Sequence, residues 1–246
     1  MKIREKMKNI CTKGAHNTPL GIDPTDYADP LFGVGSATSA GPTLPAGSVH
    51  PSPETLEKFP YEFNLVSTFT LDNDTLHHTL TVENWDEEEL PFGIGYHPAF
   101  NVPFDDQHVA TDYELRFSEM ESPICLNCLP TGLVQDNHYY LGSNIKAIPI
   151  DEHLFDNDSH CMVNIRSGKL GVYEKGTGRA VVCNIEEFPY CLLWSKPGMP
   201  KFVCIEPWHS LPSPEGGSKN WNEKPAAAVL NPGESWSTTL STSFVR

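Results

Sequence analysis

The sequence is poor in positive charge and in long apolar runs. No stretch of about 18 apolar residues is present, so we expect no membrane span. Only 17 Lys and Arg stand against 32 Asp and Glu, which gives a formal net charge of −15. Such an excess of negative charge repels phosphate, and we therefore expect no nucleic-acid partner. The phosphate-binding, dinucleotide-binding, nucleophile-elbow and HExxH zinc motifs are also missing, which argues against the enzyme classes that use them.

A helical repeat of apolar residues is missing too, and strand-like alternation takes its place. Leu65, Phe69 and Leu71 fall on one side of an extended segment whose other side is polar. The turn Asp72-Asn73-Asp74 joins this segment to a second alternating one. With 22 Pro and 18 Gly, turn signals divide the chain into about ten strands at roughly 8–12-residue spacing. The expected strands lie at 61–71, 76–83, 92–96, 113–117, 145–150, 162–165, 170–173, 179–185, 191–194, 202–205 and 236–244. We predict an all-β protein, a large antiparallel β-sandwich.

The first part of the chain differs from the rest. Residues 1–52 are rich in Gly and Pro and show little alternation, and we expect an irregular, poorly ordered segment there. Residues 53–246 carry the alternating pattern and form the expected sandwich domain. Positive charges at the N-terminus precede no apolar stretch, so we expect no signal peptide. The 7 cysteines form no regular framework and several lie in apolar runs, which favours free thiols in a reducing cytoplasm.

The segment 95–101 contains the first candidate for chemistry. Gly93 and Gly95 leave space on the strand face that also carries His97, and Pro98 then ends the strand. A ligand could approach closely there, and a histidine can donate or accept a proton near neutral pH. The alternative is a histidine at a strand end whose ring nitrogens bond only to the backbone.

Glu206 is the second candidate. It continues the apolar face formed by Phe202 and Cys204, and Pro207-Trp208 follows it directly. A carboxylate on a buried face is unfavourable unless it is paired or functional. The alternative is a carboxylate that simply reaches water at the end of its strand.

Three further groups are weaker candidates. Asp156 and Asp158 could bind a ligand, form a turn with their own backbone, or contribute to a weak calcium loop. Cys125-Leu-Asn-Cys128 is a single C-x-x-C pair, which is too little for a zinc or redox site. Trp194, Trp208 and Trp221 could stack on sugars, although buried packing is the commoner role of tryptophan.

Seven sequence blocks together resemble the aldose 1-epimerase (galactose mutarotase-like) superfamily, in particular its LacX-type branch. The resemblance begins near Pro53 and continues to the C-terminus, with the blocks in the family's order. The blocks are Phe59-Pro-Tyr-Glu-Phe63, Pro91-Phe-Gly-Ile-Gly-Tyr-His-Pro-Ala-Phe-Asn101, Glu152-His-Leu-Phe-Asp-Asn-Asp158, Phe188-Pro-Tyr190, Trp194-Ser-Lys-Pro-Gly198, Cys204-Ile-Glu-Pro-Trp208 and Asn231-Pro-Gly-Glu234.

The resemblance implies a large twisted β-sandwich with a sugar site in an open groove, and catalysis without metal or cofactor. In the family, the histidine that matches His97 is the general acid toward the ring oxygen, and the carboxylate that matches Glu206 is the general base on the anomeric hydroxyl. The pyranose opens to an aldehyde, rotates and closes as the other anomer. The family's sugar-binding aspartate matches Asp156 best, with Asp158 as the alternative register. The expected groove also contains Asn101, Trp194, Lys196 and Trp208.

One part of the family pattern is missing. Relatives carry N-terminal strands that end in a His-Gly-Phe-Ala-Arg-type block, which supplies a second histidine and an arginine to the sugar site. Here His16 and His50 stand in other sequence contexts. We therefore expect a sandwich that is incomplete at its N-terminus. An incomplete sandwich exposes a strand edge and part of an apolar face, which favours homo-oligomers.

The sequence supports two main hypotheses. The first is an aldose 1-epimerase with weakened activity toward a small-molecule sugar, a free hexose or a related compound. A sugar phosphate is less favoured, because the chain has no visible cluster of arginines. The second is a catalytically weak or inactive carbohydrate-binding protein on the same scaffold. A third hypothesis, an unstable truncated chain without a role, predicts no cooperative unfolding.

Overall fold

The computed structural model describes residues 43–246, and β-strands dominate this range. The strands form an eight-stranded sheet, a six-stranded sheet and a two-stranded sheet. Every pairing between named strands is antiparallel in this part of the chain. The predicted all-β fold, a large antiparallel β-sandwich, is confirmed.

The eight-stranded sheet has the order β1-β2-β3-β16-β12-β11-β6-β9. In that order its strands are β1 (Thr43–Val49), β2 (Phe63–Asp72), β3 (Thr75–Asn84), β16 (Ser235–Val245), β12 (Ala180–Asn184), β11 (Lys169–Glu174), β6 (Tyr113–Glu121) and β9 (Ile145–Pro149). The hairpin predicted between β2 and β3 is present, with Asp72 opposite Thr75. Asn73 has a φ of 50° at this turn. Asparagine tolerates that left-handed conformation better than most residues, which explains the tight connection.

The six-stranded sheet has the order β5-β14-β13-β10-β7-β8. Its strands are β5 (Ala99–Asn101), β14 (Phe202–Trp208), β13 (Tyr190–Trp194), β10 (His160–Met162), β7 (Ile124–Cys128) and β8 (Val134–Tyr140). The two-stranded sheet pairs β15 (Ala228–Leu230) with β4 (Leu90–Phe92). Three short helices complete the described structure: α2 (Pro53–Lys58), η2 (Ala110–Asp112) and η3 (Trp221–Glu223).

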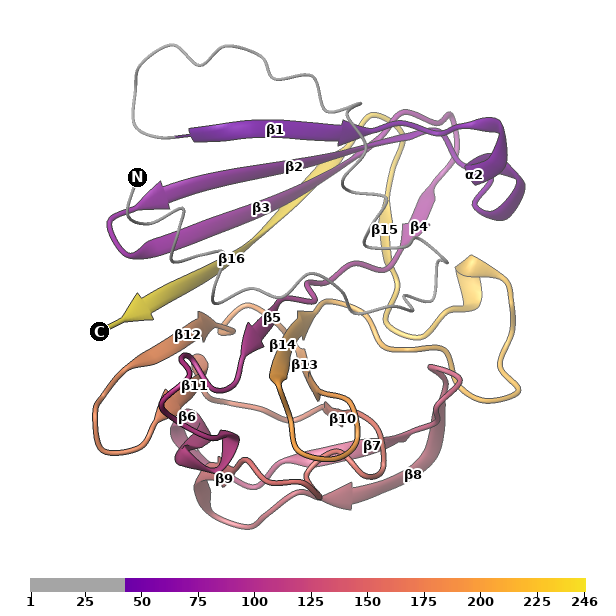
Figure 1. Ribbon diagram of the computed structural model, residues 1–246. Coiled ribbons are helices and arrows are strands. Elements are labelled where there is room, and N and C mark those ends of the chain that lie inside the picture. The colour runs from indigo at the N-terminus through magenta and orange to yellow at the C-terminus, as the bar shows by residue number, and fades with distance from the viewer. Residues whose placement is uncertain (1–42) are drawn as a thin grey trace.

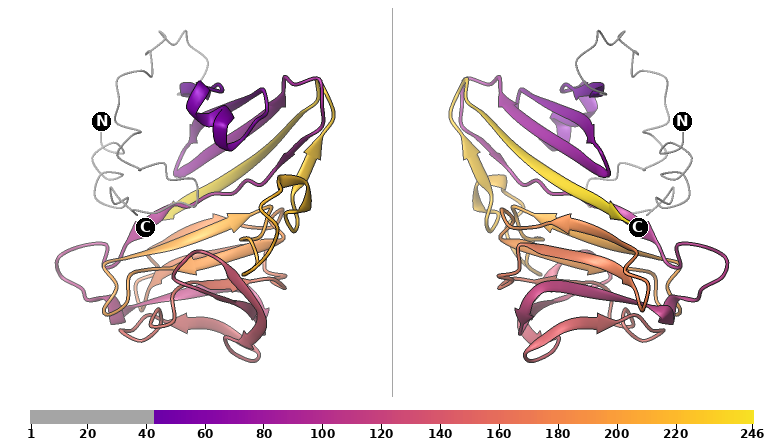
Figure 2. Two further views of the ribbon diagram at one scale, coloured as in Figure 1. Left: turned by 90° about the vertical axis from the view of Figure 1, so that its right-hand side faces the viewer. Right: turned by 90° about the vertical axis from the view of Figure 1, so that its left-hand side faces the viewer.

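The main hydrophobic core lies between the six-stranded sheet and the strands β6, β11 and β12. Phe117 and Val172 contribute from the eight-stranded sheet, and Met162, Leu193 and Ile205 contribute from the six-stranded sheet. Figure 1 places β1 and β2 at one end of the molecule and β7 and β8 at the other, and both views in Figure 2 show the same separation. The six-stranded sheet therefore covers only part of the eight-stranded one.

Several segments differ from the sequence-based prediction, among them the short elements α2, β5 and β15, which were not predicted. Residues 43–49 form β1 on the edge of the large sheet, although we expected irregular structure up to residue 52. The rest of that expected segment, residues 1–42, lies outside the described range. Strands β7 and β8 were not predicted, since β8 is rich in polar residues and β7 contains the C-x-x-C pair, which we considered only as a possible metal or redox motif. The strand expected at 92–96 ends at Phe92 in β4, since the glycine-containing segment after it bends toward β14.

The described cysteines and helices fit the composition. All six cysteines in residues 43–246 are free and buried, as their apolar surroundings predict. In the same range, no helix has the length and hydropathy of a membrane span.

Candidate active site

Strand β14 presents different residues on its two faces. Val203 and Ile205 belong to the main core, whereas Cys204 and Glu206 alternate with them and lie on the opposite face. Both Cys204 and Glu206 are buried, and Glu206 sits opposite Leu192 of β13. The alternation in the sequence therefore places the carboxylate on the face of the six-stranded sheet that points away from the main core.

A short segment between β4 and β5 carries His97 to this face. Gly95 bridges to Trp208, the backbone N–H of Tyr96 donates to the carbonyl of Pro207 at 3.0 Å, and the Trp208 indole Nε1–H donates to the carbonyl of Tyr96 at 3.0 Å. A Cβ at Gly95 would lie 2.4 Å from Cδ1 of Trp208. Only glycine permits this close approach, so the segment is fastened to β14 immediately before His97.

Tyr96 fixes the same segment from its other side. Its buried hydroxyl lies 2.9 Å from the carbonyl oxygen of His78 and 2.8 Å from that of Thr238. These contacts connect the segment to β3 and β16 of the large sheet. Burial raises the pKa of Tyr96 to about 12, which keeps the phenol a hydrogen-bond donor at neutral pH.

His97 and Glu206 are in direct contact. His97 Nε2 lies 3.2 Å from Glu206 Oε1, and the two side chains are 33% and 3% exposed. The histidine therefore forms the solvent-accessible side of the pair and the carboxylate forms the buried side. The structure therefore favours a paired His97 over a histidine bonded only to the backbone. It also favours a paired Glu206 over a carboxylate that simply reaches water.

Burial shifts the pKa values of the two groups in opposite directions. It raises the pKa of Glu206 well above its ordinary value, because the charged carboxylate is removed from water. Nearby Cys128 and Asp158 add smaller contributions in the same direction. Burial lowers the pKa of His97, and a hydrogen bond to the backbone of its own residue opposes this only in part. The two pKa values are therefore shifted in opposite directions, that of the carboxyl upward and that of the imidazole downward, which reduces the difference between them from its usual size.

Two of the predicted groove residues, Trp194 and Trp208, contact His97 or its segment, whereas Asn101 lies further along β14. The ring of Trp194 approaches that of His97 edge to face, with 6.0 Å between their centroids. Asn101 lies on β5 opposite Phe202 of β14, and Trp208 holds the Tyr96 carbonyl as described above. Trp208 therefore acts here as a support for the His97 segment.

The remaining predicted residues are placed differently. Asp156 is exposed, and its carboxylate lies 2.9 Å from Nδ1 of His153. Asp158 is the aspartate close enough to raise the pKa of Glu206. Lys196 lies in the exposed loop between β13 and β14. Both aspartates therefore stay candidates for the sugar-binding position.

Sequence reasoning missed Cys204 as a neighbour of the pair. Its sulfur and the reactive atoms of His97 and Glu206 all lie within 4.8 Å of one another. The signal was available, because Cys204 and Glu206 stand two residues apart on one strand and so share a face. The approach of His97 could not be predicted from that spacing.

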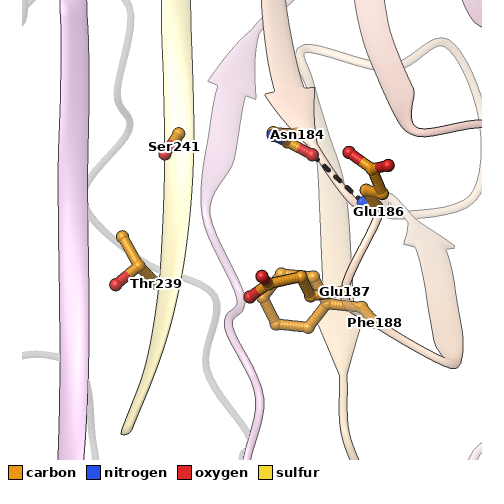
Figure 3. Close-up of a pocket in the computed structure, with 6 residues that line it drawn as sticks. All are labelled: Asn184, Glu186, Glu187, Phe188, Thr239 and Ser241. Atoms are coloured by element: carbon orange, nitrogen blue, oxygen red, sulfur yellow. Dashed lines mark hydrogen bonds between the residues drawn. The ribbon is translucent and has the colours of Figure 1, made fainter.

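A separate cavity of about 470 Å³ lies beside β16, where β12 ends and the chain turns toward β13 (Figure 3). Its lining residues are Asn184, Glu186, Glu187, Phe188, Thr239 and Ser241. The Thr239 and Ser241 hydroxyls bond to side chains of β3 at 2.8 Å each. Neither His97 nor Glu206 lines this cavity, so we place the candidate chemistry outside it.

Comparison with known proteins agrees with the resemblance seen in the sequence. Residues 47–243 match the aldose 1-epimerase family. The chain is 30% identical over 189 residues to the plasmid and chromosomal LacX proteins of Lactococcus lactis subsp. lactis, which covers 75% of this chain and 63% of each relative. The chain therefore spans less than two thirds of the length of these curated relatives.

Solved structures show the same fold. A galactose mutarotase-like protein from Lactobacillus casei ATCC 334 superposes with a TM-score of 0.74 at 26% identity, over 85% of this chain and 72% of that one. A galactose mutarotase related enzyme from Lactobacillus acidophilus gives a TM-score of 0.79 at 20% identity, over 97% of this chain and 78% of that one. By the family match over most of its length, the chain belongs to the aldose 1-epimerase family.

Proposed function

We propose that the protein interconverts the α and β anomers of a hexose or a related sugar by acid–base ring opening. The observation that carries this proposal is the contact of 3.2 Å between His97 Nε2 and Glu206 Oε1, in a pair that is open to solvent on the histidine side. Membership of the aldose 1-epimerase family supports the reaction class.

The direct contact suits two proton transfers at neighbouring oxygens. The ring oxygen and the anomeric hydroxyl of a pyranose are bonded to the same carbon, so the two groups that act on them must both lie within reach of one end of the sugar ring. Glu206 would accept the proton of the anomeric hydroxyl while His97 donates one to the ring oxygen. The bond between the ring oxygen and the anomeric carbon then breaks, and an open-chain aldehyde forms.

The proton balance closes when the ring closes again. Rotation about the C1–C2 bond turns the other face of the aldehyde toward the hydroxyl that formed from the ring oxygen. This hydroxyl attacks that face, and its proton returns to His97. The carbonyl oxygen takes back the proton from Glu206 and becomes the hydroxyl of the other anomer. A raised carboxyl pKa makes Glu206 a stronger base, and a lowered imidazole pKa makes protonated His97 a stronger acid.

The proposed sugar would lie against the exposed side of His97. Trp194 offers an aromatic face next to the histidine, and Asn101 and Trp208 lie on adjoining strands. We propose Asp158 or Asp156 as a hydrogen-bond partner of sugar hydroxyls, and Lys196 as a residue at the groove margin. Cytoplasmic location, the lack of a nucleic-acid partner and homo-oligomer formation stay predictions of the sequence.

A second function is a catalytically weak or inactive carbohydrate-binding relative on the same scaffold. The observation that favours it is the side chain of Trp194, which lies beside His97 with 6.0 Å between ring centroids and could hold a sugar whether or not the pair transfers protons.

Polarimetry of freshly dissolved α-D-glucose and α-D-galactose separates the two functions. The enzyme hypothesis predicts mutarotation faster than in buffer, and a rate equal to buffer with Glu206→Gln. If the wild-type protein unfolds cooperatively but leaves the buffer rate unchanged with both sugars, the carbohydrate-binding alternative is favoured.

A further inference from the structure

Three different metal-binding side chains meet at one point of the described structure. One ligand atom each from His97, Cys204 and Glu206 lies within 4.8 Å of the other two. Cys204 and Glu206 are fixed on one face of β14, and His97 reaches them from the segment fastened by Trp208. A nitrogen, a sulfur and a carboxylate oxygen are the three ligand types that zinc takes in proteins.

The distances suit a tetrahedral ion after a small movement of side chains. Zinc bonds to nitrogen and oxygen at about 2.0–2.2 Å, so these two ligands stand roughly 3.4 Å apart in a tetrahedron. The observed separation of His97 Nε2 and Glu206 Oε1 is 3.2 Å. The thiol needs to approach by at most about 1 Å to complete the set, given zinc–sulfur bonds of about 2.3 Å.

The surroundings of the cluster favour a cation. The His97 imidazole hydrogen-bonds the backbone of its own residue, and Nδ1 is the nitrogen that can do so, which leaves Nε2 directed at Glu206. The exposed third of the His97 side chain provides an entry path and an open fourth position.

A second cluster of possible metal ligands in the described range is already neutralised by an arginine side chain. The ligand atoms of Asp105, His108 and Glu174 also lie within 4.8 Å of one another. There the Arg179 guanidinium already bonds Asp105 at 2.7 Å and Glu174 at 3.1 Å. This fixed positive charge opposes a second cation, whereas the described contacts of His97, Cys204 and Glu206 include no Arg or Lys.

We propose that His97, Cys204 and Glu206 form a binding site for a thiophilic divalent cation such as Zn²⁺, with one position left open to solvent. Binding releases the proton of the Cys204 thiol to water, because the thiolate is the ligand. The ion also binds Nε2 of His97 and the carboxylate of Glu206. It therefore competes with proton transfer, and zinc acts as a reversible inhibitor of the anomerisation proposed above. Only this inhibition depends on the proposed function, since binding itself does not.

Cobalt reports the metal–sulfur bond directly. Full-length protein, kept reduced, is titrated with Co²⁺ and followed by near-ultraviolet thiolate-to-cobalt charge transfer, and Zn²⁺ affinity is measured by competition. We expect one ion per chain in the wild type. Cys204→Ala should abolish the charge-transfer band and weaken zinc binding at least about 100-fold, since loss of an outer partner alone costs 10–100-fold.

Cys125→Ala is the matched control. Cys125 is equally buried on the six-stranded sheet but faces the main core, and we expect its substitution to leave the band and the affinity unchanged. If Cys204→Ala fails to fold, Cys204→Ser serves in its place, because the band requires sulfur. In the wild type, zinc should stop mutarotation and a chelator should restore it, whereas Cys204→Ala should mutarotate in the presence of zinc.

Two results would overturn the site. One is the absence of cobalt binding by the folded wild-type protein. The other is an unchanged band and zinc affinity in Cys204→Ala, which would move the metal to another thiol set such as Cys128 and Cys161. A cobalt band that depends on Cys204, in a protein that shows no mutarotation, would confirm the metal site and contradict the proposed enzyme.

Discussion

The two halves of the eight-stranded sheet follow the same alternating pattern but are packed differently. Leu170 and Val181 on β11 and β12 are buried in the main core, under the six-stranded sheet. On β2 and β3, the corresponding residues Leu71, Leu76 and Leu80 are only half-buried. Alternation shows that a strand has an apolar face, but it does not show how well that face is covered.

This difference bears on the candidate site. Glu206 and Cys204 lie on a strand of the six-stranded sheet, and the opposite face of that strand contributes Val203 and Ile205 to the main core. Tyr96 then ties the His97 segment to β3 and β16. The geometry of the pair is therefore set by β14 of the six-stranded sheet and by the contacts of Tyr96 with β3 and β16 of the large sheet.

Truncation of apolar side chains should show the packing difference between the two halves of the eight-stranded sheet most strongly. Phe117→Ala removes a fully buried ring from the packed half and should lower the free energy of unfolding by about 3–5 kcal/mol. Phe69→Ala removes a half-buried ring that stacks on His78 at 4.1 Å, and should lower it by only about 1–2 kcal/mol. Urea denaturation of both variants measures the two losses. Equal losses would show that β2 is as well packed as β6, and the comparison would be wrong.

Gly95→Ala tests how His97 is positioned. The new Cβ would meet Trp208 Cδ1 at 2.4 Å and its backbone Cα at 3.0 Å, so the His97 segment must move away from β14. A displacement of about 1 Å should reduce the mutarotation rate roughly 10²-fold. Circular dichroism checks that the fold is retained.

Gly168→Ala is the control for this substitution, because its Cβ would meet nothing closer than 3.6 Å. We expect this variant to keep the wild-type rate. Full activity in Gly95→Ala would show that the placement of His97 does not depend on the contact with Trp208.

Glu206→Gln should have a smaller, stabilising effect on the fold. Because the pKa of Glu206 is raised in the folded state, its contribution is favourable at low pH, where it is protonated, and is lost as the pH rises through the folded-state pKa. Above that pKa, removal of the charge should raise Tm by about 2–4 °C, which corresponds to roughly 1 kcal/mol. Calorimetry at several pH values measures the difference between the two proteins. A gain that persists unchanged at about pH 4 would contradict burial of the charge as its cause.

The sequence alone predicted what depends on local pattern. The alternation and the turn at Asn73 specified the β2–β3 hairpin, and the shared parity of Phe202, Cys204 and Glu206 placed the carboxylate on an apolar strand. Strands β7 and β8 could not be predicted in the same way. Polar side chains mask the period of two in β8, and in β7 the buried residues Cys125 and Cys128 stand three positions apart.

Contacts between distant segments were beyond local pattern. The approach of His97 to Glu206 depends on the contact of Gly95 with Trp208 and on the Tyr96 hydroxyl, which reaches two other strands. Cys204 gains its place in the site only through this approach. The family resemblance indicated both members of the pair, but their separation and burial had to come from the structure.

Kinetic coupling between His97 and Glu206 tests the central claim most directly. Anomer exchange of galactose, followed by NMR saturation transfer across a range of pH, gives the rate for the wild type, His97→Gln, Glu206→Gln and the double variant. We predict a bell-shaped profile for the wild type and similar losses, about 10²–10⁴-fold, in both single variants and in the double variant, because the two groups act as a unit. A double-variant loss equal to the product of the single losses would show that the residues act independently and would contradict the account.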